Sequence, residues 1–129
     1  MNEKFNYLIK NGEVTITKCT DKSATEIEIP SEIDGYPVKR ISDCAFKDCK
    51  NLKNVKIGKG LRTIGRMAFY NCSNLTEIEI PNTVIKISDL AFDWCPKIKR
   101  VDFQVPNKEC HVNCTAGLPL RKCVDGNWR

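Results

Sequence analysis

Residues 41–63 read ISDCAFKDCKNLKNVKIGKGLRT, residues 64–86 read IGRMAFYNCSNLTEIEIPNTVIK, and residues 87–103 read ISDLAFDWCPKIKRVDF. Seven apolar positions return at the same places in all three segments, and equivalent positions lie 23 residues apart. A fixed period of this length indicates a solenoid, in which each coil buries its apolar face against the next coil. Solenoids usually present a long exposed surface for binding, and they rarely enclose a catalytic pocket.

Composition places the chain among ordinary folded domains. It has 129 residues, 41% hydrophobic and 29% charged residues, and a mild formal net charge of +5. This is enough for one domain with a modest core. No apolar run approaches the roughly 18–20 residues that span a membrane, so we expect no membrane insertion. The first residues, MNEKFNY, lack the apolar core of a signal peptide, which leaves an intracellular protein or a removed leader as alternatives.

The N-terminal segment predicts a β-hairpin. Two β-rich runs, Phe5–Lys10 and Glu13–Thr17, flank Asn11-Gly12, the strongest short signal for a type I′ turn. The resulting register sets Lys10 opposite Glu13, Ile9 opposite Val14, and Tyr7 opposite Ile16. Because the first coil of a solenoid needs a cover for its apolar face, we interpret this hairpin as the N-terminal cap.

The repeat divides the chain into three parts. The segment TEIEIP occurs at residues 25–30 and again at 76–81, which indicates a degenerate repeat ahead of the regular ones. We therefore predict a hairpin cap with a degenerate first repeat over 1–40, three regular 23-residue repeats over 41–103, and a Cys-rich C-terminal cap or tail over 104–129.

Within each repeat unit, the spacing of the apolar residues changes from one segment to the next. Pairs such as Val55/Ile57 alternate with polar residues, which is the spacing of a strand. Ser42 and Ser88 stand where a serine N-cap would open a short helical turn. We therefore expect an α/β solenoid, with parallel strands stacked on one side and helical turns on the other.

The repeat motifs resemble a known family. The stretches ISDCAFKDCKNLKNVKI, TIGRMAFYNCSNLTEIEIP, FNYLIKNGEVTIT and IPSEIDGYPVKRI resemble the BspA-type (treponemal-type) leucine-rich repeat, over about residues 5 to 106. The resemblance implies a right-handed solenoid with a parallel strand ladder on the concave face. Members are typically surface or secreted proteins of bacteria and parasitic protists, linked to adhesion and host-protein binding. The tail from Gln104 departs from the pattern.

The resemblance therefore implies a protein-binding, adhesion-type module at the cell surface or secreted, not an enzyme and without a cofactor. Its expected partner is a protein, such as a host or matrix protein. The missing signal peptide keeps an intracellular protein-interaction scaffold as the alternative. A zinc-dependent enzyme is the least favoured hypothesis.

The strand ladder predicts where binding occurs. Alternate side chains face outward, and equivalent positions of neighbouring units stack. Two outward columns follow: Glu26, Asn54, Glu77 and Arg100; and Glu28, Lys56, Glu79 and Asp102. These residues form cross-strand charge pairs worth roughly 0.2–1 kcal/mol each, or make up a recognition surface on the concave face, and the two interpretations are compatible.

The first regular unit is strongly basic. Between residues 41 and 63 it carries six lysines and arginines against two aspartates, and the basic stripe includes Lys50, Lys53, Lys59 and Arg62. Such a stripe either binds a polyanion or is a solvated rim that keeps the solenoid soluble. No aromatic residues interleave with these lysines, which disfavours nucleic acid as the partner.

The eight cysteines fall into two groups. Cys49, Cys72 and Cys95 share a repeat position, Cys44 aligns with Met67 and Leu90, and we interpret all four as buried, reduced thiols. The others, Cys19, Cys110, Cys114 and Cys123, could form disulfides or remain free. A zinc site made by Cys110, His111, Cys114 and Cys123 is a weaker alternative, because the spacing is not a standard one.

Overall fold

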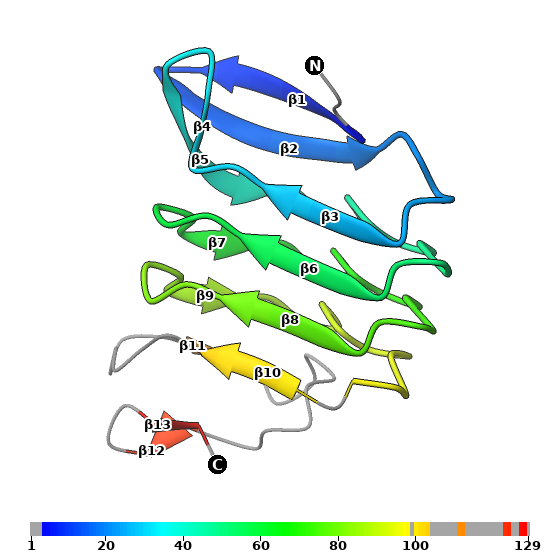
Figure 1. Cartoon of the computed structure of the whole chain (residues 1–129). Coiled ribbons are helices and arrows are strands. Elements are labelled where there is room, and N and C mark those ends of the chain that lie inside the picture. Colours follow the sequence, from blue (N-terminus) through cyan, green and yellow to red (C-terminus); the bar gives the residue numbers. More distant parts are fainter. Residues whose placement is uncertain (1–3, 99, 104–110, 113–122, 125–126, 129) are drawn as a thin grey trace.

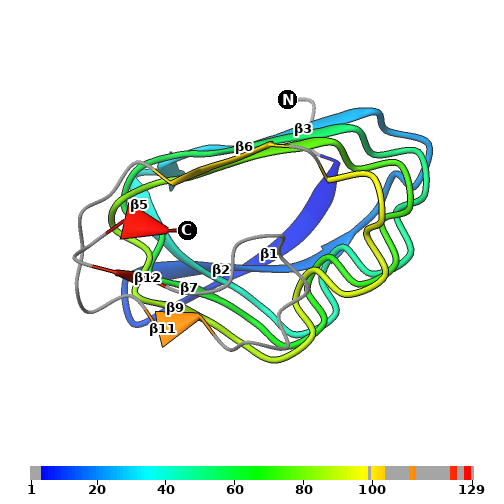
Figure 2. The same cartoon turned by 90° about the horizontal axis from the view of Figure 1, so that it is seen from below.

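The structure, a computed structural model, describes residues 4–98, 100–103, 111–112, 123–124 and 127–128, with side chains for 4–98. The chain winds downward in successive right-handed coils, each adding one strand to either side (Figure 1). Seen along the axis, the coils superimpose around a common interior (Figure 2). The predicted solenoid with parallel strand ladders is confirmed.

Two parallel ladders form the sides of the solenoid. One sheet has the order β1-β2-β5-β7-β9-β11, with β4 paired to β5, and the other has the order β10-β8-β6-β3. A separate antiparallel pair joins β12 and β13. The strands are β1 (Phe5–Lys10), β2 (Glu13–Cys19), β3 (Glu26–Ile29), β4 (Glu32–Ile33), β5 (Tyr36–Ile41), β6 (Asn54–Ile57), β7 (Thr63–Ile64), β8 (Glu77–Ile80), β9 (Lys86–Ile87), β10 (Arg100–Phe103), β11 (His111–Val112), β12 (Cys123–Val124) and β13 (Asn127–Trp128).

The N-terminal hairpin cap is confirmed. β1 runs antiparallel to β2 with the predicted register, in which Lys10 faces Glu13, Ile9 faces Val14, and Tyr7 faces Ile16. Asn11 and Gly12 have φ values of 53° and 75°, as a type I′ turn requires. β2 also pairs in parallel with β5, so the second strand of the cap is the first strand of the longer ladder.

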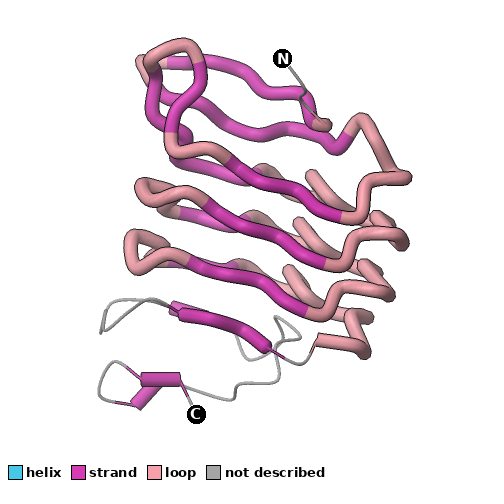
Figure 3. Tube along the Cα trace, in the orientation of Figure 1, coloured by secondary structure: helices cyan, strands magenta, loops and turns pink. Residues whose placement is uncertain are grey.

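The predicted helical turns were wrong for the described residues, which contain strands and turns but no helix (Figure 3). In the segment after Ser42, every second backbone N–H instead donates a hydrogen bond to the next coil. The N–H groups of Cys44, Phe46 and Asp48 donate to the carbonyl oxygens of Arg66, Ala68 and Tyr70, respectively. Cys44 and Asp48 have φ values of 59° and 63°. These left-handed residues break any helix and keep the turn flat enough to stack.

The core lies between the ladders and is entirely apolar among the residues whose side chains are described. Isoleucine, leucine and valine line the strands, while one phenylalanine per coil fills the turn side. Phe46, Phe69 and Phe92 stack nearly parallel, with centroid distances of 5.1 and 5.2 Å. Phe5 of the hairpin packs edge-on against Phe46 and covers this column from above.

The ladder continues past Phe103, where the sequence pattern loses its regularity. β11 pairs in parallel with β9 and sets Val112 beside Ile87. The division at residue 104 nevertheless stays a prediction, because residues 104–110 and 113–122 lie outside the described part.

Candidate binding surface

The four-stranded ladder presents two rows of polar side chains on its outer face. Strand alternation buries Ile27, Ile29, Val55, Ile57, Ile78 and Ile80 against the core. The intervening residues point outward in the predicted columns, with Glu26, Asn54 and Glu77 in one row and Glu28, Lys56 and Glu79 in the other, and the backbone register continues these rows to Arg100 and Asp102. For Arg100 and Asp102 the structure gives the backbone position only.

Among the residues with described side chains, the charges on this face do not form close ion pairs. Glu28 and Lys56 are exposed and Glu79 is half-buried. Within residues 4–98, the one ion pair within 4.0 Å joins Arg40 to Glu13 on the other ladder. Lys56 therefore lies beyond that distance from Glu28 and Glu79, and its ammonium group remains available to a ligand.

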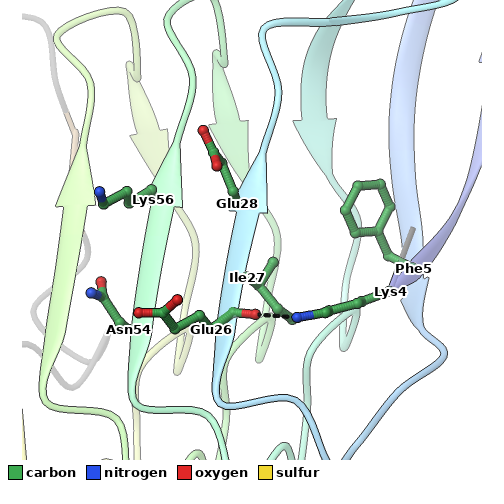
Figure 4. Close-up of a pocket in the computed structure, with 7 residues that line it drawn as sticks. All are labelled: Lys4, Phe5, Glu26, Ile27, Glu28, Asn54 and Lys56. Atoms are coloured by element: carbon green, nitrogen blue, oxygen red, sulfur yellow. Dashed lines mark hydrogen bonds between the residues drawn. The ribbon is translucent and has the colours of Figure 1, made fainter. Parts of the chain in front are cut away.

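A shallow hollow opens at the N-terminal end of this face. It has a volume of about 310 Å³ and is lined by Lys4, Phe5, Glu26, Ile27, Glu28, Asn54 and Lys56 (Figure 4). Lys4 Nζ donates a hydrogen bond to the carbonyl oxygen of Glu26 at 3.2 Å. The sequence columns missed Lys4 and Phe5, because the hairpin lies outside the repeat and only the folded chain brings it to β3.

The residues of the predicted basic stripe lie on both sides of β6. Lys50 and Lys53 precede β6, whereas Lys59 and Arg62 follow it. All four are exposed, and β6 separates the two pairs. The exposed Lys56 lies on β6 between the two pairs, and a role of the stripe in binding stays a prediction.

A second, more open hollow of about 530 Å³ lies on the other ladder. Its lining includes Gly65, where the backbone of one coil closely approaches Asp43 of the coil above. Asp43 Oδ1 accepts a hydrogen bond from the Arg66 N–H at 2.8 Å. The carboxylate is thus occupied in joining two coils.

The core thiols are hydrogen-bonded in pairs: the pKa values of Cys49 and Cys72 are raised, and the hydrogen bonds with these two lower the pKa values of Cys19 and Cys95. Cys72 and Cys95 donate to the carbonyl oxygens of Phe46 and Phe69, at 3.2 and 3.1 Å. The hydrogen bond with Cys19, together with burial, raises the pKa of Cys49. The hydrogen bond with Cys95, together with burial, raises the pKa of Cys72. Both groups therefore stay protonated at neutral pH.

Two cysteines lie where the sequence did not predict them. Cys44 is exposed rather than buried, because its left-handed conformation puts it at the outside of the turn. Cys19 is a free, buried thiol beside Cys49. Cys19 therefore forms no disulfide in this structure, and disulfide pairing stays a prediction for Cys110, Cys114 and Cys123, whose side chains lie outside the described residues.

Among residues with described side chains, no three potential metal ligands come together. The alternative zinc ligands Cys110, His111, Cys114 and Cys123 fall outside that part. In the described part of the chain no helix has the length and apolar character needed to cross a membrane.

Comparison with known proteins relates this fold to other solenoids. A family model described as BspA type leucine rich repeat region matches residues 15–124 in 6 copies. A leucine-rich repeat protein of T. pallidum is 31% identical with a TM-score of 0.73, and the match covers 78% of this chain and 47% of that one. A leucine-rich cell surface protein of Faecalibacterium prausnitzii is 30% identical with a TM-score of 0.69, covering 78% of this chain and 29% of that one.

The chain therefore spans less than half the length of these two structures. A leucine-rich repeat protein of Bacteroides capillosus is closer in size, with 25% identity, a TM-score of 0.66, and coverage of 88% of this chain and 91% of that one. No curated protein matches the sequence.

Proposed function

Because the chain belongs to the BspA-type leucine-rich repeat family, we propose that it is a recognition module that binds a protein on the outer face of the β3–β6–β8–β10 ladder. The ligand contacts the two outward rows that include Glu28, Lys56 and Glu79. Leucine-rich repeat proteins are generally non-enzymatic binding modules, and our proposal assigns this chain no catalytic role.

One observation carries the proposal: the ladder register fixes charged side chains in rows without pairing them closely to one another. Glu28, Lys56 and Glu79 are neighbours across three strands. A rigid backbone that already holds such groups in place loses little conformational entropy on binding. The mixed signs along the row favour a protein partner of complementary pattern over a simple polyanion.

We also propose a cellular location for this chain, on the basis of its family. One similar structure is that of a leucine-rich cell surface protein, which favours recognition at the cell surface for this chain, including adhesion to a host or matrix protein. An intracellular protein-interaction scaffold is the alternative. The intact mass of the native protein, measured with and without alkylation, distinguishes them: tail disulfides favour the surface, whereas eight alkylatable thiols favour the scaffold.

Charge reversal tests the binding face. The variant carries Lys56→Glu and Glu79→Lys, and the control carries Lys86→Glu and Glu32→Lys, which are exposed positions outside this ladder. A protein captured from a matrix extract by the wild type is purified and titrated against all three. We expect about tenfold or weaker binding for the face variant and wild-type binding for the control. Equal binding by all three, with wild-type folding, would refute the proposed face.

A further inference from the structure

The four-stranded ladder ends in an open strand edge at β3. The Asn54 N–H donates to the Thr25 carbonyl at 3.2 Å, and the Gly58 N–H donates to the Ile29 carbonyl at 2.7 Å. Residues 25, 27 and 29 therefore direct their backbone groups toward β6. Because backbone groups alternate along a parallel strand, Glu26 and Glu28 direct theirs to the opposite edge.

The N-terminal hairpin does not close this edge. β1 pairs with β2, and β2 pairs with β5, so the cap extends the other ladder (Figure 1). Among described residues, Lys4 Nζ on the Glu26 carbonyl is the one hydrogen bond found at this edge. Pro30 follows the strand at once. Lysine and proline are typical protections of an exposed edge, but within residues 4–98 nothing bonds the backbone N–H and C=O of Glu28 on this side.

We propose that β3 is a docking edge for an extended, basic segment of a partner protein, which adds a strand beside Glu26–Ile29. Backbone hydrogen bonds to Glu28 supply the pairing, as in other cases of strand addition. Glu26 and Glu28 both point outward and are exposed, so lysine or arginine at alternate positions of the added strand would lie across from them. The adjacent hollow, about 310 Å³, leaves room for these side chains.

A second copy of this chain fits the same edge poorly. Antiparallel pairing of β3 with β3 of another molecule would set Glu26 and Glu28 against each other, and like charges opposite one another destabilise a strand pair. The charge pattern therefore favours a basic partner over self-association. The inference rests on the proposed role as a protein-interaction module, but it uses the strand edge instead of the outer face.

Lys4 occupies the position that the incoming strand needs. Its ammonium group lies on the Glu26 carbonyl, and Figure 4 shows the side chain extended toward the edge of β3 and ending beside Glu26. Strand addition must displace this group. The Lys4→Ala variant is therefore expected to bind the peptide more tightly than the wild type, which is the reverse of what loss of an ordinary contact would cause.

The probe is a synthetic peptide of about six residues, the usual length of a strand, in which lysine alternates with valine. The control peptide replaces each lysine with glutamate. Fluorescence anisotropy measures affinity for the wild type, Lys4→Ala, Glu28→Gln and Glu28→Pro. Proline at 28 removes an edge N–H that β6 does not use, so pairing of β3 with β6 is retained.

Glu28→Pro is expected to weaken binding about tenfold or more, and Glu28→Gln to weaken it less, because glutamine keeps the backbone donor. Amide hydrogen exchange on the wild type gives an answer that does not depend on any variant folding. In the free protein the Glu28 amide should exchange much faster than those of Ile27 and Ile29, and the lysine peptide should protect it.

Three outcomes would overturn the inference. The first is a Glu28 amide already protected in the dilute free protein, which would mean that the chain covers its own edge. The second is protection that grows with protein concentration without peptide, which would mean self-association. The third is a lysine peptide that fails to bind or leaves Glu28 unprotected. None of these results bears on Lys56 and Glu79, so the outer-face proposal is tested separately.

Discussion

The rings of Phe46 and Phe69 lie face to face, with 5.1 Å between their centroids and 6° between their planes. Phe69 stacks on Phe92 with 5.2 Å and 4°. All three side chains are completely buried. A column of stacked rings thus passes through successive coils. Because each coil of a solenoid contacts only its neighbours, these ring contacts join the coils into one cooperative unit.

Phe69 is the central ring of this column, and its truncation should be costly. We expect Phe69→Ala to lower the free energy of unfolding by about 3–5 kcal/mol, because the cavity removes contacts with both neighbouring rings. Phe69→Leu should cost less, since leucine refills much of the space. Urea unfolding followed by circular dichroism measures both. A loss below about 1 kcal/mol for Phe69→Ala would contradict the continuous column.

Gly65 is required by the close approach of adjacent coils. A Cβ atom there would lie 2.6 Å from both the backbone nitrogen and Oδ1 of Asp43. We expect Gly65→Ala to destabilise the protein by about 1–3 kcal/mol, measured as a lower Tm. Adding Asp43→Ala should not restore stability, because the backbone contact remains. Arg66→Ala, at the exposed neighbouring position, serves as the near-neutral control.

Trp94 is the misfit at a left-handed turn position. Its φ is 60° and its side chain is 66% exposed, while the equivalent residues in the preceding coils are Asp48 and Asn71. Asn71 Nδ2 donates to Asp48 Oδ1 at 2.9 Å. Trp94→Asn should raise stability by about 0.5–1 kcal/mol, because asparagine tolerates this conformation better than a bulky residue. Trp94→Ala should raise the stability less than Trp94→Asn does. If thermal unfolding gives both variants the same stability, relief of backbone strain at residue 94 is not the cause of the gain.

The thiols should differ sharply in reactivity. Cys44 is exposed, whereas Cys49, Cys72 and Cys95 are no more than 8% exposed. Under native conditions iodoacetamide should modify Cys44 first, and the three repeat thiols only when the protein unfolds. Peptide mapping at successive times measures each rate. Rapid native modification of Cys72 would contradict its burial.

Alkaline pH should destabilise the protein partly through Cys72. Its folded pKa is raised, by the hydrogen bond with Cys95 and by burial, so the folded state keeps a proton that the unfolded state releases above about pH 8.5. The contribution to stability is thus complete below that pH and is lost as the pH rises. Between about pH 8 and pH 10, we expect the free energy of unfolding to fall more steeply for the wild type than for Cys72→Ala. Parallel curves would refute this.

The sequence predicted the ladder well because two regular periods fix it. Alternation along each strand decides which residues face outward, and the 23-residue step decides which residues become neighbours. The 23-residue step places Lys56 and Glu79 in one row, the recurrence of TEIEIP at residues 25–30 and 76–81 adds Glu28 to it, and the ladder register agrees. The hairpin register followed in the same way from Asn11-Gly12.

The turns were predicted less well because their hydrogen bonds go to another coil. Ser42 resembles a helix N-cap in sequence, but Cys44 and Phe46 donate to Arg66 and Ala68 of the next coil. These hydrogen-bond partners are distant in the chain, so the helix propensity of the local sequence cannot predict them. The exposure of Cys44 follows from the same left-handed turn.

By itself, the sequence determined the repeat, the apolar core and the rows of outward side chains, because translational periodicity converts chain position directly into spatial position. Only the tertiary structure decided how the non-repeating hairpin meets the first coil. Lys4 lies on the Glu26 carbonyl and Cys19 lies beside Cys49. No period relates these residues, so their contacts depend on how the cap packs over the core and on which strand edge it leaves open.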